Sequence, residues 1–281
     1  MKTNRTAKRL LFTFFVASTV LLALPRDTRA QQSDKNTDKN EVIKKARQTY
    51  YNLKSEGLTE FRCSMTPDWE YILKEARKND AESIDLAVKK LQALHFSLTL
   101  GLDGNAQVLH NEITAENDQV ASGLRQIYSG MTQMATGFFQ TWSGYMIQTA
   151  LPEVGSDFQL VESDSEYRIS YKDGAADVTT LMAKDFTITS QAVRGKDFDA
   201  TLKPKFNKIA KGLVLASYQA TYHGATPAEE TLLDVGINYQ DVNALQFPSE
   251  ITLNGSYAGT PFSAKVSFFD CQATKTFKDP M

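Results

Sequence analysis

The chain has 281 residues, with 31 Lys and Arg, 33 Asp and Glu, and only two cysteines. Residues 1–30 hold six of the basic and one of the acidic side chains, so the remaining chain has 25 basic and 32 acidic groups and a formal charge of −7. This acidic balance argues against nucleic acid or an anionic membrane surface as the default partner, because both require a basic face. About 250 residues is enough for one large β-rich domain with its own core.

The first 30 residues have the order of a cleavable secretory signal. Met1–Arg9 carries four basic residues and no acid, Leu10–Leu24 is an apolar run, and residues 28–30 place small side chains around a cut after Ala30. The apolar run is short for a bilayer, which needs about 20 residues, so a retained anchor is the alternative. We therefore expect cleavage after Ala30 and a periplasmic or secreted protein without a later transmembrane segment.

Residues 31–40 are polar and charged, which predicts a disordered leader, and residues 41–277 are expected to form a single domain. The first half of this domain mixes helices and strands. Apolar residues at helical spacing predict helices at 41–55, from Pro67 to about residue 76, and at 81–94. Alternating residues predict strands at 58–65, 95–102 and 106–112, the last two joined at Asp103-Gly104.

Residues 117–149 contain a seven-residue repeat. A hydroxyl residue followed by glycine recurs at every seventh position, ending at Gly123, Gly130, Gly137 and Gly144. In a helix, Ser, Thr and Gln share one face, large apolar residues form a stripe opposite, and the glycines border that stripe. Each glycine costs a helix roughly 1 kcal/mol relative to alanine, so we expect close backbone approach to a packing partner to compensate.

The apolar stripe of this helix is rich in Met and aromatic residues. Because Met adapts to varied shapes, the stripe is a candidate to line or gate an apolar cavity. The alternative is an ordinary core helix, since apolar stripes usually face a core. The candidate ligand-lining residues are Met131, Met134, Phe138, Trp142 and Tyr145.

After Pro152 the pattern changes to strands without intervening helices, which predicts an antiparallel meander. The expected strands cover residues 167–171, 176–180, a segment from Phe186, 198–209, 213–222, 232–239, 248–257 and 262–269. A long meander twists and curls, and its hollow needs a filler, for which the chain offers its own helices. We therefore expect an α+β fold: a curled antiparallel β-meander, or half-barrel, with N-terminal and central helices on its concave face.

Cys63 and Cys271 are the only cysteines. Export places them in an oxidising compartment, where such a pair usually forms a disulfide. We expect a bridge between the start of the domain and its last strand. Two separate buried thiols are the alternative.

One segment resembles a known family. Residues 236–242 and 245–251, with Tyr239, Val242, Pro248 and Ile251, are similar to the "Y-x-x-V…P-x-x-I" run of LolA-like proteins. That superfamily comprises exported bacterial proteins with a curled antiparallel half-barrel covered by helices. The resemblance implies periplasmic handling of lipids or lipoproteins, with the apolar concave face as the ligand site, and it transfers no individual binding residue.

The sequence offers little for catalysis. No HExxH, CxxC, GxSxG or G-x-G motif occurs, and His95, His110 and His223 lie far apart in the chain. Glu162, Asp164 and Glu166 alternate as calcium ligands could, but the calcium-loop pattern is missing and a solvated edge is favoured.

We therefore predict no enzyme, no catalytic residue, no metal and no cofactor. The expected function is binding or carrying a lipid or another apolar ligand in the cell envelope. An envelope protein-interaction module without a ligand is the alternative, and a hydrolase whose site assembles from distant residues is a third possibility.

Overall fold

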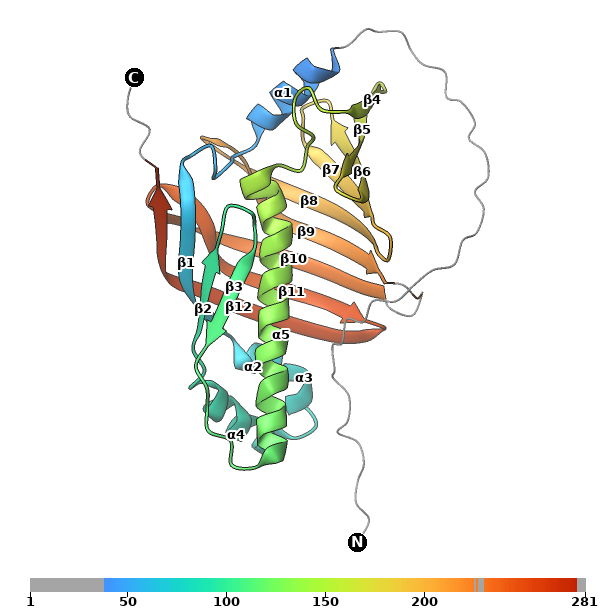
Figure 1. Ribbon diagram of the computed structural model, residues 1–281. Helices are drawn as coiled ribbons and strands as arrows, with labels where there is room; N and C mark the ends of the chain where they lie inside the picture. The colour runs from blue at the N-terminus through green and yellow to red at the C-terminus, as the bar shows by residue number, and fades with distance from the viewer. Residues whose placement is uncertain (1–37, 225, 227–229, 277–281) are drawn as a thin grey trace.

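The computed structural model describes residues 38–224, 226 and 230–276 (Figure 1). In this part of the chain, twelve strands form one open antiparallel sheet. Its order is β3-β2-β1-β12-β11-β10-β9-β8-β7-β6-β5-β4, so β3 and β4 are its two terminal strands. The chain first builds one end of the sheet, crosses it with a long helix, and then returns strand by strand from the other end until β12 pairs with β1.

The helical elements are α1 (Lys39–Thr49), α2 (Trp69–Ile72), α3 (Lys74–Arg77), α4 (Ala81–Leu91), α5 (Asp118–Ser143) and the π-helix η1 (Gly144–Gln148). The strands of the first half are β1 (Leu58–Pro67), β2 (Phe96–Leu100) and β3 (Ala106–His110). The strands of the second half are β4 (Phe158–Glu162), β5 (Glu166–Asp173), β6 (Ala176–Ala183), β7 (Ile188–Arg194), β8 (Asp199–Ile209), β9 (Gly212–His223), β10 (Glu230–Val242), β11 (Leu245–Tyr257) and β12 (Thr260–Lys275).

Helix α5 lies across one side of the sheet, with β1–β3 to one side of it and β4–β7 to the other (Figure 1). We call the side that α5 covers the inner face. The contacts are made by large side chains: the ring of Phe139 lies 5.4 Å from that of Phe268 on β12, and the indole of Trp142 lies 6.1 Å from the ring of Phe247 on β11. Residues of α1 join the same core, with Ile43 and Ala46 fully buried.

The sequence predicts the antiparallel meander correctly. Alternation identifies β5 and β6 and their turn at Asp173-Gly174, where Gly174 has a φ of +58°. It also identifies the run from β8 to β12; strands β9 to β12 are longer than predicted at one end or both, whereas β8 begins one residue later than predicted, at Asp199. The sequence pattern does not predict strand β4, because its five residues contain only two inward apolar side chains, Phe158 and Leu160.

The helices differ from expectation at their ends. Asp38 caps α1 by accepting a hydrogen bond from the backbone N–H of Asn40, so α1 starts inside the segment expected to be a disordered leader. The expected helix after Pro67 is divided at Leu73 into α2 and α3. The long helix leaves α-geometry at Gly144, continues as η1, and ends at Thr149 with a φ of 119°.

The expected close approach at the repeat glycines is wrong. A Cβ atom added at Gly123, Gly130, Gly137 or Gly144 would meet nothing within 4 Å. Within the described residues, no other element therefore packs against the helix at these glycines. The close approach occurs instead at Gly104 in the β2–β3 turn, where an added Cβ would lie 2.2 Å from Oγ of Ser143.

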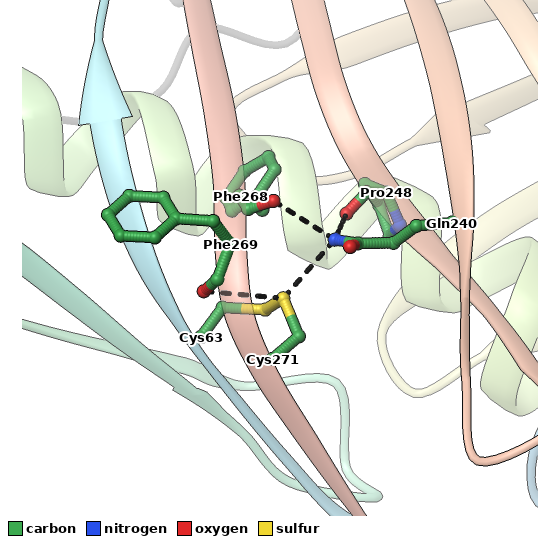
Figure 2. Close-up of a disulfide and its surroundings, with 6 residues drawn as sticks. All are labelled: Cys63, Gln240, Pro248, Phe268, Phe269 and Cys271. Atoms are coloured by element: carbon green, nitrogen blue, oxygen red, sulfur yellow. Dashed lines mark hydrogen bonds between the residues drawn. A yellow bond between two sulfur atoms is a disulfide. The ribbon is translucent and has the colours of Figure 1, made fainter.

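The expected disulfide is confirmed: Cys63 on β1 is bonded to Cys271 on β12. The two strands are adjacent and antiparallel, and a bulge places Asp270 and Cys271 opposite the single residue Cys63. Figure 2 shows the side-chain amide of Gln240 directed at the bridge; its Nε2 lies 3.2 Å from Sγ of Cys271 and 3.0 Å from the carbonyl oxygens of Pro248 and Phe268.

The predicted signal peptide (residues 1–30) and most of the predicted leader lie outside the described residues. Within the described ranges, none of the helices combines the length and apolar character needed to cross a membrane.

Candidate binding site

The five candidate ligand-lining residues lie on α5 and η1 and take part in the core between helix and sheet. Four are buried, with exposed fractions of 6% for Met131, 2% for Phe138, 0% for Trp142 and 4% for Tyr145. Met134 is half-buried and packs against the same core. The helix therefore brings all five together on its apolar side, as its periodicity predicts.

In this arrangement the space beneath α5 is filled by side chains. Phe61 on β1 stacks on Phe247 on β11 with 3.7 Å between ring centroids, and Phe139, Trp142 and Phe247 are all fully buried. The indole N–H of Trp142 donates to the hydroxyl of Tyr239 over 2.9 Å. An apolar ligand beneath α5 would therefore have to displace these side chains or move the helix.

A polar cluster interrupts this apolar interior near the C-terminal end of α5. The hydroxyl of Tyr145 donates to Oε1 of Gln191 on β7 over 3.1 Å, and Nε2 of Gln191 donates to the carbonyl of Ala150 over 3.2 Å and lies 3.4 Å from Oγ1 of Thr180 on β6. Apart from tyrosines, Thr180 and Gln191 are two of the three buried polar side chains among the described residues. Tyr171 on β5 hydrogen-bonds to both.

The cluster continues on β9. Tyr218 and Tyr222 both hydrogen-bond to the hydroxyl of Thr141 on α5, which itself donates to the carbonyl of Gly137 over 3.1 Å. We call Thr141, Tyr145, Tyr171, Thr180, Gln191, Tyr218 and Tyr222 the tyrosine cluster.

Burial keeps the phenols of this cluster neutral. Desolvation raises the pKa of Tyr145, and the nearby phenols of Tyr171 and Tyr222 raise it further. Burial and, secondarily, Asp173 raise the pKa of Tyr171 to about 12, while its hydrogen bonds to Thr180 and Gln191 oppose the shift. The cluster therefore offers uncharged hydroxyls as hydrogen-bonding groups over the physiological pH range.

An open groove of about 800 Å³ lies beside this cluster. It is bounded by the end of α1, the segment at 148–159, and strands β4–β6, which lie near one another at the α1 end of the molecule (Figure 1). Tyr171 belongs to both the groove and the tyrosine cluster, so its ring connects the polar interior to solvent. This volume is in the range of small-molecule sites, about 300–1,000 Å³.

The groove has an acidic lining. Its charged residues are Arg47, Glu153, Asp157, Lys172, Asp173 and Asp177. Both cations are already engaged: Arg47 donates to the carbonyls of Leu151 and Pro152 over 3.1 and 2.9 Å, and Lys172 pairs with Asp177 at 2.9 Å. Lys39, beside the groove, donates to the carbonyl of Phe158 over 2.8 Å.

The histidines lie in separate environments. His110 on β3 stacks on Tyr128 of α5 with 3.8 Å between ring centroids, and Nδ1 of His223 lies 3.8 Å from Glu230. His95 meets Asn111 through its backbone N–H. Among the described residues no three His, Cys, Asp or Glu side chains gather as a metal site would require.

Sequence reasoning missed the tyrosine cluster and the groove. A usable signal existed, because Tyr171, Tyr218 and Tyr222 stand at inward positions of alternating strands, where a hydroxyl needs a buried partner. Their partners lie on other strands and on α5, however, and sequence spacing does not reveal such contacts.

Comparison of the chain with models of protein families, with curated proteins and with solved structures finds no match.

Proposed function

We propose that this chain is an exported cell-envelope protein that binds or carries a lipid or another apolar ligand. In this proposal the sheet is a curled half-barrel, α5 is the cover along its concave face, and the arrangement described above is the closed form. The resemblance of residues 236–251 to LolA-like proteins and the secretory order of residues 1–30 support the envelope location.

One observation carries the proposal: among the described residues, the helix that covers the apolar inner face has no close neighbour beside its repeat glycines. Its inner side packs through large side chains, whereas a Cβ atom added at Gly123, Gly130 or Gly137 on α5, or at Gly144 at the start of η1, would meet nothing within 4 Å outside the helix's own backbone. Each of these glycines weakens the helix by roughly 1 kcal/mol relative to alanine. A weakly helical cover over an apolar surface can move or bend at low cost, and Met131 and Met134 suit a surface that repacks around different shapes.

The direct test combines lipid extraction with titration. Native mass spectrometry of the gently purified chain should reveal a bound apolar molecule, and a fluorescent fatty acid should bind saturably. Met134→Lys, which places a charge on the half-buried inner side of α5, should weaken this binding about tenfold or more. Gln133→Lys, on the exposed side one residue earlier, is the matched control and should change little.

A chain that is always isolated empty and shows no saturable uptake of the fatty acid would refute the carrier function. Equal loss of binding in Met134→Lys and Gln133→Lys would show that the ligand does not meet the inner side of α5.

An envelope protein-interaction module is the second candidate. It is favoured by the exposed apolar side chains of the two terminal strands, since Leu109 on β3 and Val161 on β4 are both 59% exposed. This alternative predicts that Val161→Glu abolishes cross-linking to envelope proteins, whereas fatty-acid uptake is absent in both the variant and the parent chain.

A further inference from the structure

The groove and the tyrosine cluster together have the composition of a site for a polar group. Seventeen residues line the groove, and its surface presents amide, hydroxyl and carboxylate groups such as those of Gln148, Gln159, Ser170 and Asp173. Tyr171 reaches from this lining into a network whose hydroxyls remain neutral. Oxygen atoms of this kind accept hydrogen bonds from hydroxyl donors, and the phenols and amides can also donate.

The charges of the groove decide which polar group fits. Glu153, Asp157, Asp173 and Asp177 supply four carboxylates, and the two cations in the lining are held by backbone carbonyls or by Asp177. With four carboxylates against two cations in the lining, a phosphate group would meet net negative charge, which is electrostatically unfavourable. A neutral group carrying several hydroxyls would meet acceptors and no repulsion.

We infer that the groove binds a neutral, hydroxyl-rich group of the kind that a sugar presents, at the open end of the interior that α5 covers. Resting on the proposed function, this inference specifies the ligand as an amphiphile: its apolar chain lies under α5 and its sugar-like head group lies in the groove against Tyr171. Phospholipids with anionic head groups are disfavoured.

The test compares ligands that share their chains and differ in their heads. The full chain is titrated with dioctanoylglycerol carrying one glucose, with dioctanoyl phosphatidylglycerol, and with free maltose, each followed calorimetrically. We expect the glycolipid to bind at least about tenfold more tightly than the phospholipid, as several hydrogen bonds and the avoided repulsion imply.

Two variants locate this preference in the groove. Tyr171→Phe removes one hydroxyl and should weaken glycolipid binding about fivefold without changing phospholipid binding. Tyr167→Phe, four residues earlier on β5 and outside the groove lining, is the matched control. Asp173→Lys, at an exposed position at the end of β5, should reverse the order by favouring the phosphate group.

The outcomes separate this inference from the proposed function. Equal affinity for the two lipids, or a preference for the phospholipid, overturns the head-group inference and leaves a carrier of apolar chains. Binding of maltose alone, lost in Tyr171→Phe, supports the sugar site and refutes the carrier function. Failure of all three ligands to bind overturns both.

Discussion

Gly130 and Gly137 occupy exposed helical positions with open space around them. Alanine at either position would lower the backbone entropy of the unfolded chain and would clash with nothing. We therefore expect Gly130→Ala and Gly137→Ala each to raise the free energy of unfolding by about 1 kcal/mol, as measured by urea denaturation.

Substitution of Gly104 should have the opposite effect on stability to substitution of these two glycines. Its φ is +80°, and a Cβ atom there would lie 2.2 Å from Oγ of Ser143. Gly104→Ala should therefore destabilise the fold by about 1–3 kcal/mol in the same assay, through strain in the turn and displacement of the end of α5. Destabilisation by Gly130→Ala of similar size would mean that α5 has a packing partner on its glycine side.

Tyr218 should give the protein a measurable sensitivity to alkaline pH. Burial raises the pKa of its phenol, with a further contribution from Tyr222, whereas an unfolded chain has the ordinary value of about 10. Below pH 10 the phenol is neutral in both states. Between pH 10 and 11 the unfolded chain loses this proton while the folded chain keeps it, so the free energy of unfolding falls by about 1 kcal/mol on account of this residue.

The comparison of the parent chain with Tyr218→Phe isolates this effect. The free energy of unfolding, measured with urea at pH 9, 10 and 11, should fall less in the variant than in the parent chain. The difference should equal the contribution given above for Tyr218, because the other buried tyrosines contribute equally to both proteins. Identical pH profiles would mean that the phenol of Tyr218 ionises as readily in the folded protein as in water.

At the scale of elements, the disulfide joins strands that are already paired. Cys63 and Cys271 are separated by 208 residues in sequence, so the bridge restricts a large loop in the unfolded chain. Replacing both by alanine should cost about 2–5 kcal/mol of unfolding free energy. Because β1 and β12 also share a ladder of backbone pairs, the variant should keep its β-sheet circular dichroism.

A reductant provides the control for the disulfide prediction. With the bridge reduced in the unfolded state, the parent chain should approach the double variant in stability. A double variant as stable as the oxidised parent would show that the bridge adds nothing to the pairing of β1 with β12.

How much of each element could be predicted depends on whether its determinants are local. The β5–β6 hairpin was predictable because alternating side chains flank Asp173-Gly174, and both signals lie within a few residues. The repeat in α5 predicted which side of the helix is polar and which is apolar. It could not show whether another element packs beside the glycines, because a glycine leaves room for a neighbour whether or not one is present. The tyrosine cluster joins residues from 141 to 222, and its formation depends on strand order, which residue patterns do not specify.

At the scale of the molecule, one sheet supports two different environments. Between α5 and β10–β12 the interior is aromatic and apolar, with Phe139, Trp142 and Phe247 fully buried. Between the end of α5 and β5–β9 it becomes a network of neutral hydroxyls that reaches the groove at Tyr171. An amphiphile is divided in the same way into an apolar and a polar part. In the proposed mechanism its apolar chain lies under α5 and its polar head group lies in the groove, so one ligand uses both environments.

This mechanism predicts that stability and ligand uptake are opposed in α5. The triple variant Gly123→Ala, Gly130→Ala and Gly137→Ala should stiffen the cover and raise the free energy of unfolding by about 3 kcal/mol if the three effects add. If α5 must bend or unwind for a ligand to enter, stopped-flow uptake of a fluorescent fatty acid should then slow by at least about tenfold. Gln133→Lys, on the exposed side of α5, exchanges residues of similar helix propensity and should leave the rate unchanged. An unchanged rate in a stabilised triple variant would exclude α5 as the moving part, and the ligand would then have to enter through the groove with the helix in place.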